Sequence, residues 1–477
     1  MIHKKVVIIG GGISGVKAAI DLYQAGITDT IIVESRDRLG GRLWTINSEK
    51  TRGLKFDMGA SWFHDTLNNP LFERAIKSKI VKYHFDDGKC QYVSQDDGDV
   101  PSWKFQTIVD EMMSYFKLAY DKDPSKPDVS LKRLCEEYMH KYKDRLTEEQ
   151  KQYALGVIRA LAELYHGETW DTLSGKYCFA NMNQHVGRRA FVENGYYNVF
   201  QTVLKELPRE YLNHNVKLNA HVDKIDYSNP SKVIVHLFDG RSYSCDYLIC
   251  TIPQSILQIT DPKDSCYLKW EPTLPPPLQK VLPDIHFGSL GKLVFEFNEC
   301  FWPEDVERFY AITNTTSKPD LLGDLSFNAW DFPSVIVNYQ ALMRLPSLVI
   351  LTQNPLSKYI ERLAKEDKQQ DIWKLFKPVL EQASLVPKGH QIPDPVAIYN
   401  SPWNGEYLTR GSYGTTPVGM NDPYKINQIL NQGFQNRIRF AGAETMNGSA
   451  NGCAHGGWFS GEREARFIIE SEKKAKL

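Results

Sequence analysis

Three glycines near the N-terminus, Gly10, Gly12 and Gly15, have the spacing of a loop that holds a dinucleotide pyrophosphate. Gly10 permits a tight turn, Gly12 lets the backbone approach the phosphates, and Gly15 allows a helix to pack closely on a strand. A helix that begins near Ile13 would offer free N–H groups and a positive dipole end to the phosphates. Glu34 follows nineteen residues after Gly15 and can accept both ribose hydroxyls, which disfavours a 2′-phosphate and hence NADP. This spacing alone fits NAD and FAD equally.

A second phosphate-binding pattern follows at once. Arg36, Gly40, Gly41 and Arg42 place two adjacent glycines between cationic side chains. The glycines let the backbone approach a phosphate or a ring, and Arg42 can neutralise pyrophosphate charge. A charged surface loop is the alternative interpretation, but the neighbouring glycine loop favours cofactor binding.

The elements that must position these residues alternate between strands and helices. Residues 4–34 read as one βαβ unit, because a buried apolar run precedes the glycines and a helical pattern over 13–25 ends at Gly26. Helical periodicity marks 110–162 and 358–383, whereas 216–253, 287–297 and 437–441 read as strands, and 452–470 as a final helix. We therefore predict an α/β fold, α+β overall. It comprises a Rossmann-like FAD-binding domain (1–78, 196–285 and 396–477) and a substrate domain of mixed sheet and helices (79–195 and 286–395).

Composition sets further limits. The 477 residues exceed one compact core, and the net charge of −1 gives no global attraction to nucleic acid or anionic lipid. A polycationic substrate would therefore need a local acidic site. The eight cysteines lack Cys-x-x-Cys or zinc-type spacing and read as scattered thiols, so we expect no metal. No window approaches the ~20 apolar residues of a membrane span.

Residues 33–42 resemble the signature of the flavin-containing amine oxidase family, in which an acidic residue precedes Arg-x-x-Gly-Gly-Arg. Residues 57–64, 246–253, 439–445 and 456–465 resemble further family segments, so the similarity runs along essentially the whole chain. Within the family, the sequence most resembles fungal polyamine oxidases that oxidise spermine. The resemblance implies that FAD, rather than NAD, occupies the dinucleotide site.

The resemblance also implies which residues hold the cofactor beyond the two N-terminal motifs. Glu444 and Thr445 would bond the ribityl chain or the pyrophosphate, and a helix starting near Gly452 would point its dipole at the flavin N1–C2 carbonyl. The remaining expected contacts are Gly59, Ala60, Ser61, Trp62, Val222, Trp403, Gly442 and Cys453. Ser412 stands where monoamine oxidases carry a flavin-tethering cysteine, so we expect FAD to be bound non-covalently.

Five residues are expected at the catalytic end. Lys292 matches the family lysine that holds a water near flavin N5, and burial would depress its pKa. His64 and Asn194 match positions that contact the amine. Trp170 and Tyr413 match aromatic residues that face the flavin and position an alkyl amine. The alternatives are a structural role for His64, a place in the core for Trp170 and a solvent-exposed strand edge for Lys292. Asp86 and Asp87 align loosely with an acidic segment, or form a solvated turn.

The implied activity is oxidation of spermine or an N-acetylated polyamine at a secondary nitrogen. Hydride would pass to flavin N5, the imine would hydrolyse to an amine and an aldehyde, and O2 would be reduced to H2O2. Other amine or amino-acid oxidases are the first alternative, since an arginine could serve a substrate carboxylate. A non-enzymatic escort protein on the same fold is the second.

The chain ends Ala475-Lys476-Leu477, which keeps the small–basic–leucine pattern of a peroxisomal address. We expect a peroxisomal import receptor to bind it and the protein to reside in peroxisomes. A charged helix end that stops on leucine by chance is the alternative.

Overall fold

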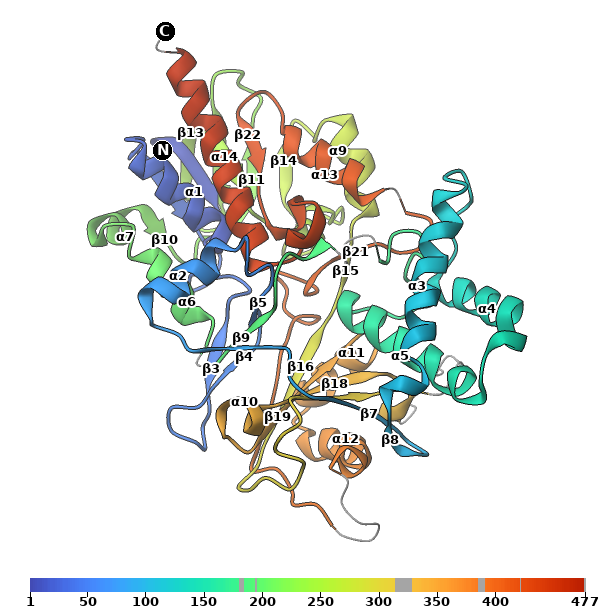
Figure 1. Cartoon of the computed structure of the whole chain (residues 1–477). Helices are drawn as coiled ribbons and strands as arrows, with labels where there is room; N and C mark the ends of the chain where they lie inside the picture. The colour runs from blue at the N-terminus through green and yellow to red at the C-terminus, as the bar shows by residue number, and fades with distance from the viewer. Residues whose placement is uncertain (180–183, 194, 314–327, 385–390, 421, 476–477) are drawn as a thin grey trace.

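The computed structural model describes residues 1–179, 184–193, 195–313, 328–384, 391–420 and 422–475. Asn194 and the last two residues of the C-terminal tripeptide lie outside the described residues, so both expectations stay predictions. The fold is a mixed α/β arrangement built around two large sheets (Figure 1).

The first sheet contains the predicted βαβ unit. Strand β1 (Ile2–Ile9), helix α1 (Ile13–Gln24) and strand β2 (Thr30–Val33) lie within a residue or two of the expected bounds, with β1 and β2 parallel. The strand order is β10-β2-β1-β13-β12-β11-β14, with β22 beside β13. The other strands are β10 (Val216–Lys217), β11 (Val222–Asp226), β12 (Val233–Leu237), β13 (Ser242–Cys250), β14 (Lys269–Glu271) and β22 (Ile438–Phe440).

Helices cover both faces of this sheet because its central strand is apolar on both sides. Val6 and Ile8 pack into one core with α1 and α14 (Ala454–Ala475), whereas Val7 and Ile9 pack into another. The second core includes side chains of α9 (Pro276–Val281) and α13 (Pro423–Gln432). Helices α1 and α14 lie side by side (Figure 1), and Gly461 permits the approach, since a Cβ there would sit 2.1 Å from the Ser14 carbonyl oxygen.

The second sheet has the order β20-β16-β19-β18-β17-β7-β8. Its strands are β7 (Cys90–Ser94), β8 (Gly98–Val100), β16 (Gly291–Glu296), β17 (Arg308–Ala311), β18 (Ser334–Asn338), β19 (Ser347–Thr352) and β20 (Ala397–Asn400). One face packs on α11 (Leu356–Lys365) and α12 (Gln369–Ala383). The domain division itself stays a prediction, but β20 falls in the range expected for the cofactor domain and pairs with β16 of this sheet.

The other face of the second sheet meets the helical region expected from periodicity. It consists of α3 (Gln106–Asp121), α4 (Leu131–Tyr142) and α5 (Glu148–His166), grouped at the right of Figure 1. Thr147 and Gln150 form a capping box at the start of α5, and Gly167 ends that helix in the left-handed conformation. Both ends of α5 are therefore specified locally.

Shorter elements join the two sheets. Strand β9 (Ala190–Val192) lies between β5 (Trp62–Phe63) and β6 (Tyr83–Phe85), β3 (Thr45–Asn47) pairs with β4 (Lys55–Asp57), and β15 (His286–Gly288) with β21 (Tyr413–Thr415). The remaining helices are α2 (Pro70–Ser78), α6 (Tyr197–Leu204), α7 (Arg209–Asn215), α8 (Gln254–Leu257) and α10 (Tyr339–Met343). Within the described ranges, no helix is long and apolar enough to cross a membrane.

Candidate active site

One cavity of ≈ 560 Å³ collects most of the expected site residues. Its wall includes Gly10, Gly12, Glu34, Arg36, Gly40, Gly41, Arg42, Gly59, Ala60, Ser61, Trp62, His64, Val222, Lys292, Trp403, Tyr413, Gly442, Glu444, Gly452 and Cys453. Gly15, Trp170 and Thr445 do not line it. We call the part around Gly10, Gly12, Glu34 and Arg42 the dinucleotide end. The part around Trp62, His64, Tyr165, His185 and Lys292 is the substrate end.

The glycine loop has the geometry that the sequence predicts. Gly10 adopts φ +101°, which favours glycine, and a Cβ on Gly15 would lie 2.0 Å from the Gly10 carbonyl oxygen. Gly15 therefore acts through helix–strand packing. Gly12 precedes α1, and within the described chain no side chain caps this helix. The free N–H groups of its first turn are available to an anion, and Ile13 and Ser14 line the cavity there.

Glu34 is buried at the end of β2, with 4% exposure. One carboxylate oxygen accepts the Gly11 N–H at 2.6 Å, and the other accepts the Arg36 N–H at 2.8 Å. Each oxygen keeps a further lone pair for a ribose hydroxyl. Glu406 binds the Arg36 guanidinium at 2.6 Å, which keeps Arg36 beside the Glu34 carboxylate.

Arg42 and Glu444 bring the N- and C-terminal motifs together. The guanidinium binds both Glu444 oxygens and donates to the Ser412 carbonyl at 2.5 Å. Gly59 is required beside them, because a Cβ there would overlap the Arg42 carbonyl. The ion pair fixes residues 42 and 444 at the wall of one cavity although about 400 positions separate them.

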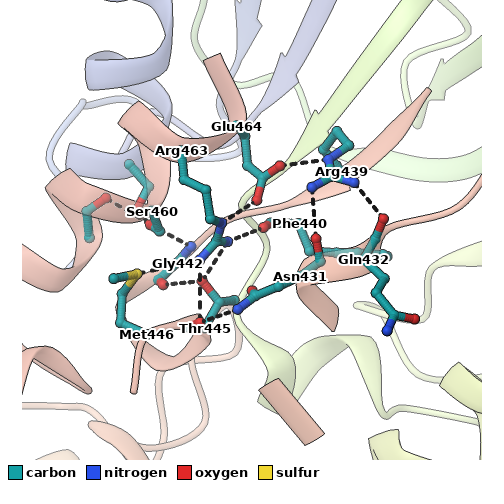
Figure 2. Close-up of polar contacts among 12 residues, drawn as sticks. Asn431, Gln432, Arg439, Phe440, Gly442, Thr445, Met446, Ser460, Arg463 and Glu464 are labelled. Carbon is teal, nitrogen blue, oxygen red and sulfur yellow. Dashed lines mark hydrogen bonds and ion pairs between the residues drawn. The ribbon is translucent and has the colours of Figure 1, made fainter. Parts of the chain in front are cut away.

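Thr445 does not line the cavity, and Figure 2 shows it beside Gly442 and Arg463. Its expected direct contact with the cofactor stays a prediction. Its hydroxyl donates to the Gly442 carbonyl at 2.8 Å and receives Arg463 Nη2 at 3.2 Å. Arg463 and Arg439 both bind Glu464, which is fully buried. These contacts tie the turn after β22 to α14, so Thr445 holds Gly442 and Glu444 in place.

Lys292 reaches from β16 into the loop that follows β4. Its ammonium donates to the carbonyls of Asp57, at 2.8 Å, and Gly59, and to the hydroxyl of Ser61. Burial lowers the pKa of Lys292 to about 8, against an opposing effect of Asp57. The expected depression of this pKa is confirmed. The ammonium also lies 5.7 Å from the centre of the Trp62 ring, so Lys292 anchors the loop between the two ends.

His64 faces the cavity beside a second histidine that the sequence did not single out. The rings of His64 and His185 lie 5.3 Å apart. Burial lowers the pKa of His64 well below its ordinary value, and nearby Arg189 adds to this effect. Within the described residues, His64 Nδ1 and Trp62 Nε1 are buried without a hydrogen-bond partner. Two unpaired polar atoms at a cavity wall mark a place where a polar ligand fits.

Trp170, expected to face the cofactor, does not line the cavity. Gly167 turns the chain back onto α5, and Trp170 is 2% exposed in the helical core, with its ring 5.1 Å from the Arg159 guanidinium. Tyr165, from the last turn of α5, lines the cavity instead. Its carbonyl accepts the Tyr413 hydroxyl at 2.8 Å. Residues 161, 164 and 165 share one helical face, which is the periodicity signal that could have identified this wall.

The charged residues at the substrate end are mainly cationic. Asp86 lines the cavity, but Arg308 Nη1 binds its carboxylate at 3.0 Å. Asp87 is exposed and paired with Arg188. Arg189 lines the cavity, and its guanidinium has no hydrogen-bond or ion-pair partner among the described residues. Arg189 is exposed. Burial raises the pKa of the Asp86 carboxyl group, and Arg308 and Arg189 are close enough to oppose that shift, so a cationic end of a substrate would meet a mixture of charges here.

Comparison with known proteins agrees with this geometry. Residues 13–469 match the family model for flavin containing amine oxidoreductase. The chain belongs to the flavin-containing amine oxidase family. A corticosteroid-binding protein of Candida albicans is 34% identical over 98% of this chain and 96% of its own. A probable polyamine oxidase of Arabidopsis thaliana is 25% identical over 98% and 88%. A lysine-specific histone demethylase homolog of the same plant is 25% identical over 98% of this chain and 52% of its own.

The residues present fit FAD, the cofactor of this family. The uncapped start of α1 and the backbone at Gly40 and Gly41 suit the pyrophosphate, and buried Glu34 suits the ribose. The start of α14, with Gly452 and Cys453 on the cavity wall, offers a second helix N-terminus to the ring system. Bound FAD supplies the acceptor for two electrons from an amine.

Proposed function

We propose that the protein is an oxygen-dependent oxidase of extended secondary alkylamines of the polyamine type, with FAD held non-covalently. The observation that carries the proposal is the continuity of one cavity from the dinucleotide end to Lys292, His64 and Tyr413. Beyond these residues the wall is apolar and suits an alkyl chain, with Leu161, Leu164, Val335, Val337 and Leu351. Family membership and the polyamine oxidase relatives support the same class.

The reaction balances as a two-electron oxidation. Bound FAD would supply the acceptor for the hydride that leaves the carbon next to a neutral amine nitrogen, and water would hydrolyse the resulting imine to an amine and an aldehyde. O2 takes up the two electrons and two protons as H2O2. The protein contributes orientation, exclusion of water and electrostatics, through Lys292, the aromatic pair Tyr165 and Tyr413, and the histidines.

A substrate panel tests the proposal. Anaerobic mixing with spermine or N1-acetylspermine should bleach the flavin spectrum, and air should restore it with one H2O2 per amine consumed. Bleaching without peroxide would remove oxygen as the acceptor. A flavin that no secondary amine bleaches would refute the function.

A second substrate class is favoured by one observation. Arg189 lines the substrate end without a hydrogen-bond or ion-pair partner among the described residues, and Arg308 lines the same cavity. A guanidinium in this state suits a carboxylate. An amine of similar length that ends in a carboxylate therefore belongs in the panel. Faster reduction by this amine than by spermine would reassign the substrate to the amino-acid type.

A further inference from the structure

Asp65 organises two histidines at the substrate end. It is 3% exposed, and one carboxylate oxygen accepts His185 Nδ1 at 2.8 Å and the Val186 N–H at 2.9 Å. The other oxygen accepts the Ser449 hydroxyl at 2.6 Å and His455 Nε2 at 3.0 Å. The group therefore connects the end of β5, the segment before β9 and the first turn of α14.

The backbone of Asp65 is held in a conformation that is uncommon for residues other than glycine. Its φ is +54°, in the left-handed region. Asn69 supports this turn by donating to the His64 carbonyl at 2.7 Å and by capping α2 with its side-chain oxygen. Non-glycine residues persist in this region where surrounding contacts determine the conformation, and such residues cluster at functional sites.

The hydrogen bond to Asp65 fixes the tautomer of His185. An ionised carboxylate only accepts hydrogen bonds, so His185 Nδ1 carries the proton and Nε2 carries the lone pair. His185 lines the cavity, and within the described residues Nε2 has no hydrogen-bond partner. Its ring is 5.3 Å from the His64 ring and 6.4 Å from the Tyr165 ring, so the imidazole lies at the substrate end.

The chemistry needs a proton acceptor at this place. An alkylammonium has a pKa near that of lysine, about 10.4, so roughly one molecule in 2,500 is neutral at pH 7. Only the neutral amine has the lone pair that stabilises the developing imine. Lys292 is saturated with three acceptors, and its own ammonium is a donor.

We propose that His185, oriented by Asp65, takes the proton from the bound ammonium before the amine is oxidised. The N–H bond of the substrate breaks, its electron pair stays on the amine nitrogen, and the proton forms a bond to Nε2. The resulting imidazolium keeps its Nδ1–H bond to Asp65. His185 is thus a catalytic residue, and Asp65 is a positioning residue.

The electrostatic surroundings suit an acceptor that is neutral before substrate binds. Burial lowers the pKa of His185, whereas the hydrogen bond and charge of Asp65 raise it. The titratable and charged groups that face His185 are Asp65, Arg189 and His455, with the His64 and Tyr165 rings beside it. Arg189 also lowers the pKa of His185, so it favours the neutral imidazole before substrate binds.

The test is the pH dependence of flavin reduction in anaerobic stopped-flow with spermine between about pH 6 and 10. In H185Q, reduction at pH 7 should fall about 100-fold and recover toward pH 10, where a large fraction of the amine is already neutral. D65N should shift the pH dependence in the same direction and lower the rate at pH 7 by about 10-fold, because it weakens the base without removing it. A loss of equal size at every pH, or no loss, would overturn the proposal.

His84 supplies a matched control, because Glu307 holds it in a histidine–carboxylate pair at 2.6 Å and His84 does not line the cavity. H84Q should keep the wild-type profile. A secondary amine with fluorine near its nitrogen, neutral at pH 7, gives a test that needs no variant. With this amine, the rate of flavin reduction by the wild type should no longer fall as the pH is lowered. A fall as steep as with spermine would contradict the proposal.

The inference rests on amine oxidation but not on the polyamine class. A wild-type flavin that neither amine reduces would refute the proposed function and the inference together. If spermine and the fluorinated amine both reduce the flavin, and H185Q changes neither rate, the inference alone would be refuted.

Discussion

The dinucleotide end of the cavity is formed largely by backbone, whereas the substrate end is formed by side chains. At the first, Gly10, Gly12 and the start of α1 lie within a few consecutive residues, and one carboxylate, Glu34, completes the set. At the second, side chains converge from β5, α5, the segment before β9, and β16. Local sequence thus determines the first end, and tertiary packing determines the second.

The largest expected effect comes from filling the glycine loop. In G15A the new Cβ would lie 2.0 Å from the Gly10 carbonyl oxygen, so β1 and α1 must separate. We expect a loss of about 1–3 kcal/mol or more in stability and a protein purified without flavin. Unfolding in denaturant and the absorbance of bound flavin measure the two effects.

G12A is the matched control, because a Cβ on Gly12 meets no described atom within 4 Å and its φ is −73°. This variant should unfold like the wild type while flavin affinity falls, since the methyl group occupies cavity space. Equal losses of stability in G15A and G12A would contradict the assignment of Gly15 to packing and of Gly12 to cofactor contact.

Lys292→Met should have the next largest effect. The carbonyls of Asp57 and Gly59 and the Ser61 hydroxyl lose their donor, and the loop between the two ends loosens. We expect flavin reduction to slow by about 100-fold, the scale of removing one preorganised charge.

The same variant has a pH signature with a definite sign. The pKa of Lys292 is about 8 in the folded protein against an ordinary 10.5, so the unfolded chain binds more protons between these values. Wild-type stability relative to K292M should therefore rise with pH across this window, by up to about 1.4 kcal/mol per unit. A difference that stays flat from pH 8 to 10 would contradict the burial of a titrating lysine.

Sequence alone identified the dinucleotide end and much of the fold. The βαβ unit, the helices of 110–162 and 358–383, and the roles of Gly10 and Gly15 follow from periodicity and local turn chemistry. Family motifs placed Lys292 and His64 on the cavity wall, whereas Trp170 and Thr445 do not line it. A motif identifies a position in the sequence. The direction of a side chain just beyond a helix, such as Trp170, depends on the turn that ends the helix.

Four side chains at the substrate end escaped prediction. Asp65, Tyr165, His185 and Arg189 lie in no cofactor motif, and contacts between distant segments bring them together. Asp65 reaches Ser449 and His455 across nearly the whole chain. Residue spacing carries no information about such contacts, so only the tertiary structure reveals them.

Arg189→Glu sharpens the description of the substrate end as cationic. The change replaces a guanidinium that has no partner in the described part of the chain with a carboxylate on the cavity wall. We expect kcat/KM for spermine, relative to the amine that ends in a carboxylate, to rise by about 10-fold, equivalent to about 1.4 kcal/mol. R188E is the control, because Arg188 is exposed and pairs with Asp87 at 2.9 Å. The same shift in both variants would indicate long-range charge rather than contact in the cavity.

The smallest effect on catalysis is expected from Trp170→Phe, which tests whether Tyr165 rather than Trp170 lines the cavity. Trp170 packs over Arg159 and away from the cavity, so the variant should lose about 1–2 kcal/mol of stability, while flavin reduction changes less than about 2-fold. Tyr165→Leu should behave in the opposite way, because Tyr165 lines the cavity and its ring meets His185. Thermal unfolding and stopped-flow reduction separate the two properties. If W170F slowed reduction 10-fold and Y165L did not, the aromatic wall would be the one expected from sequence, and the turn at Gly167 would have to open when substrate binds.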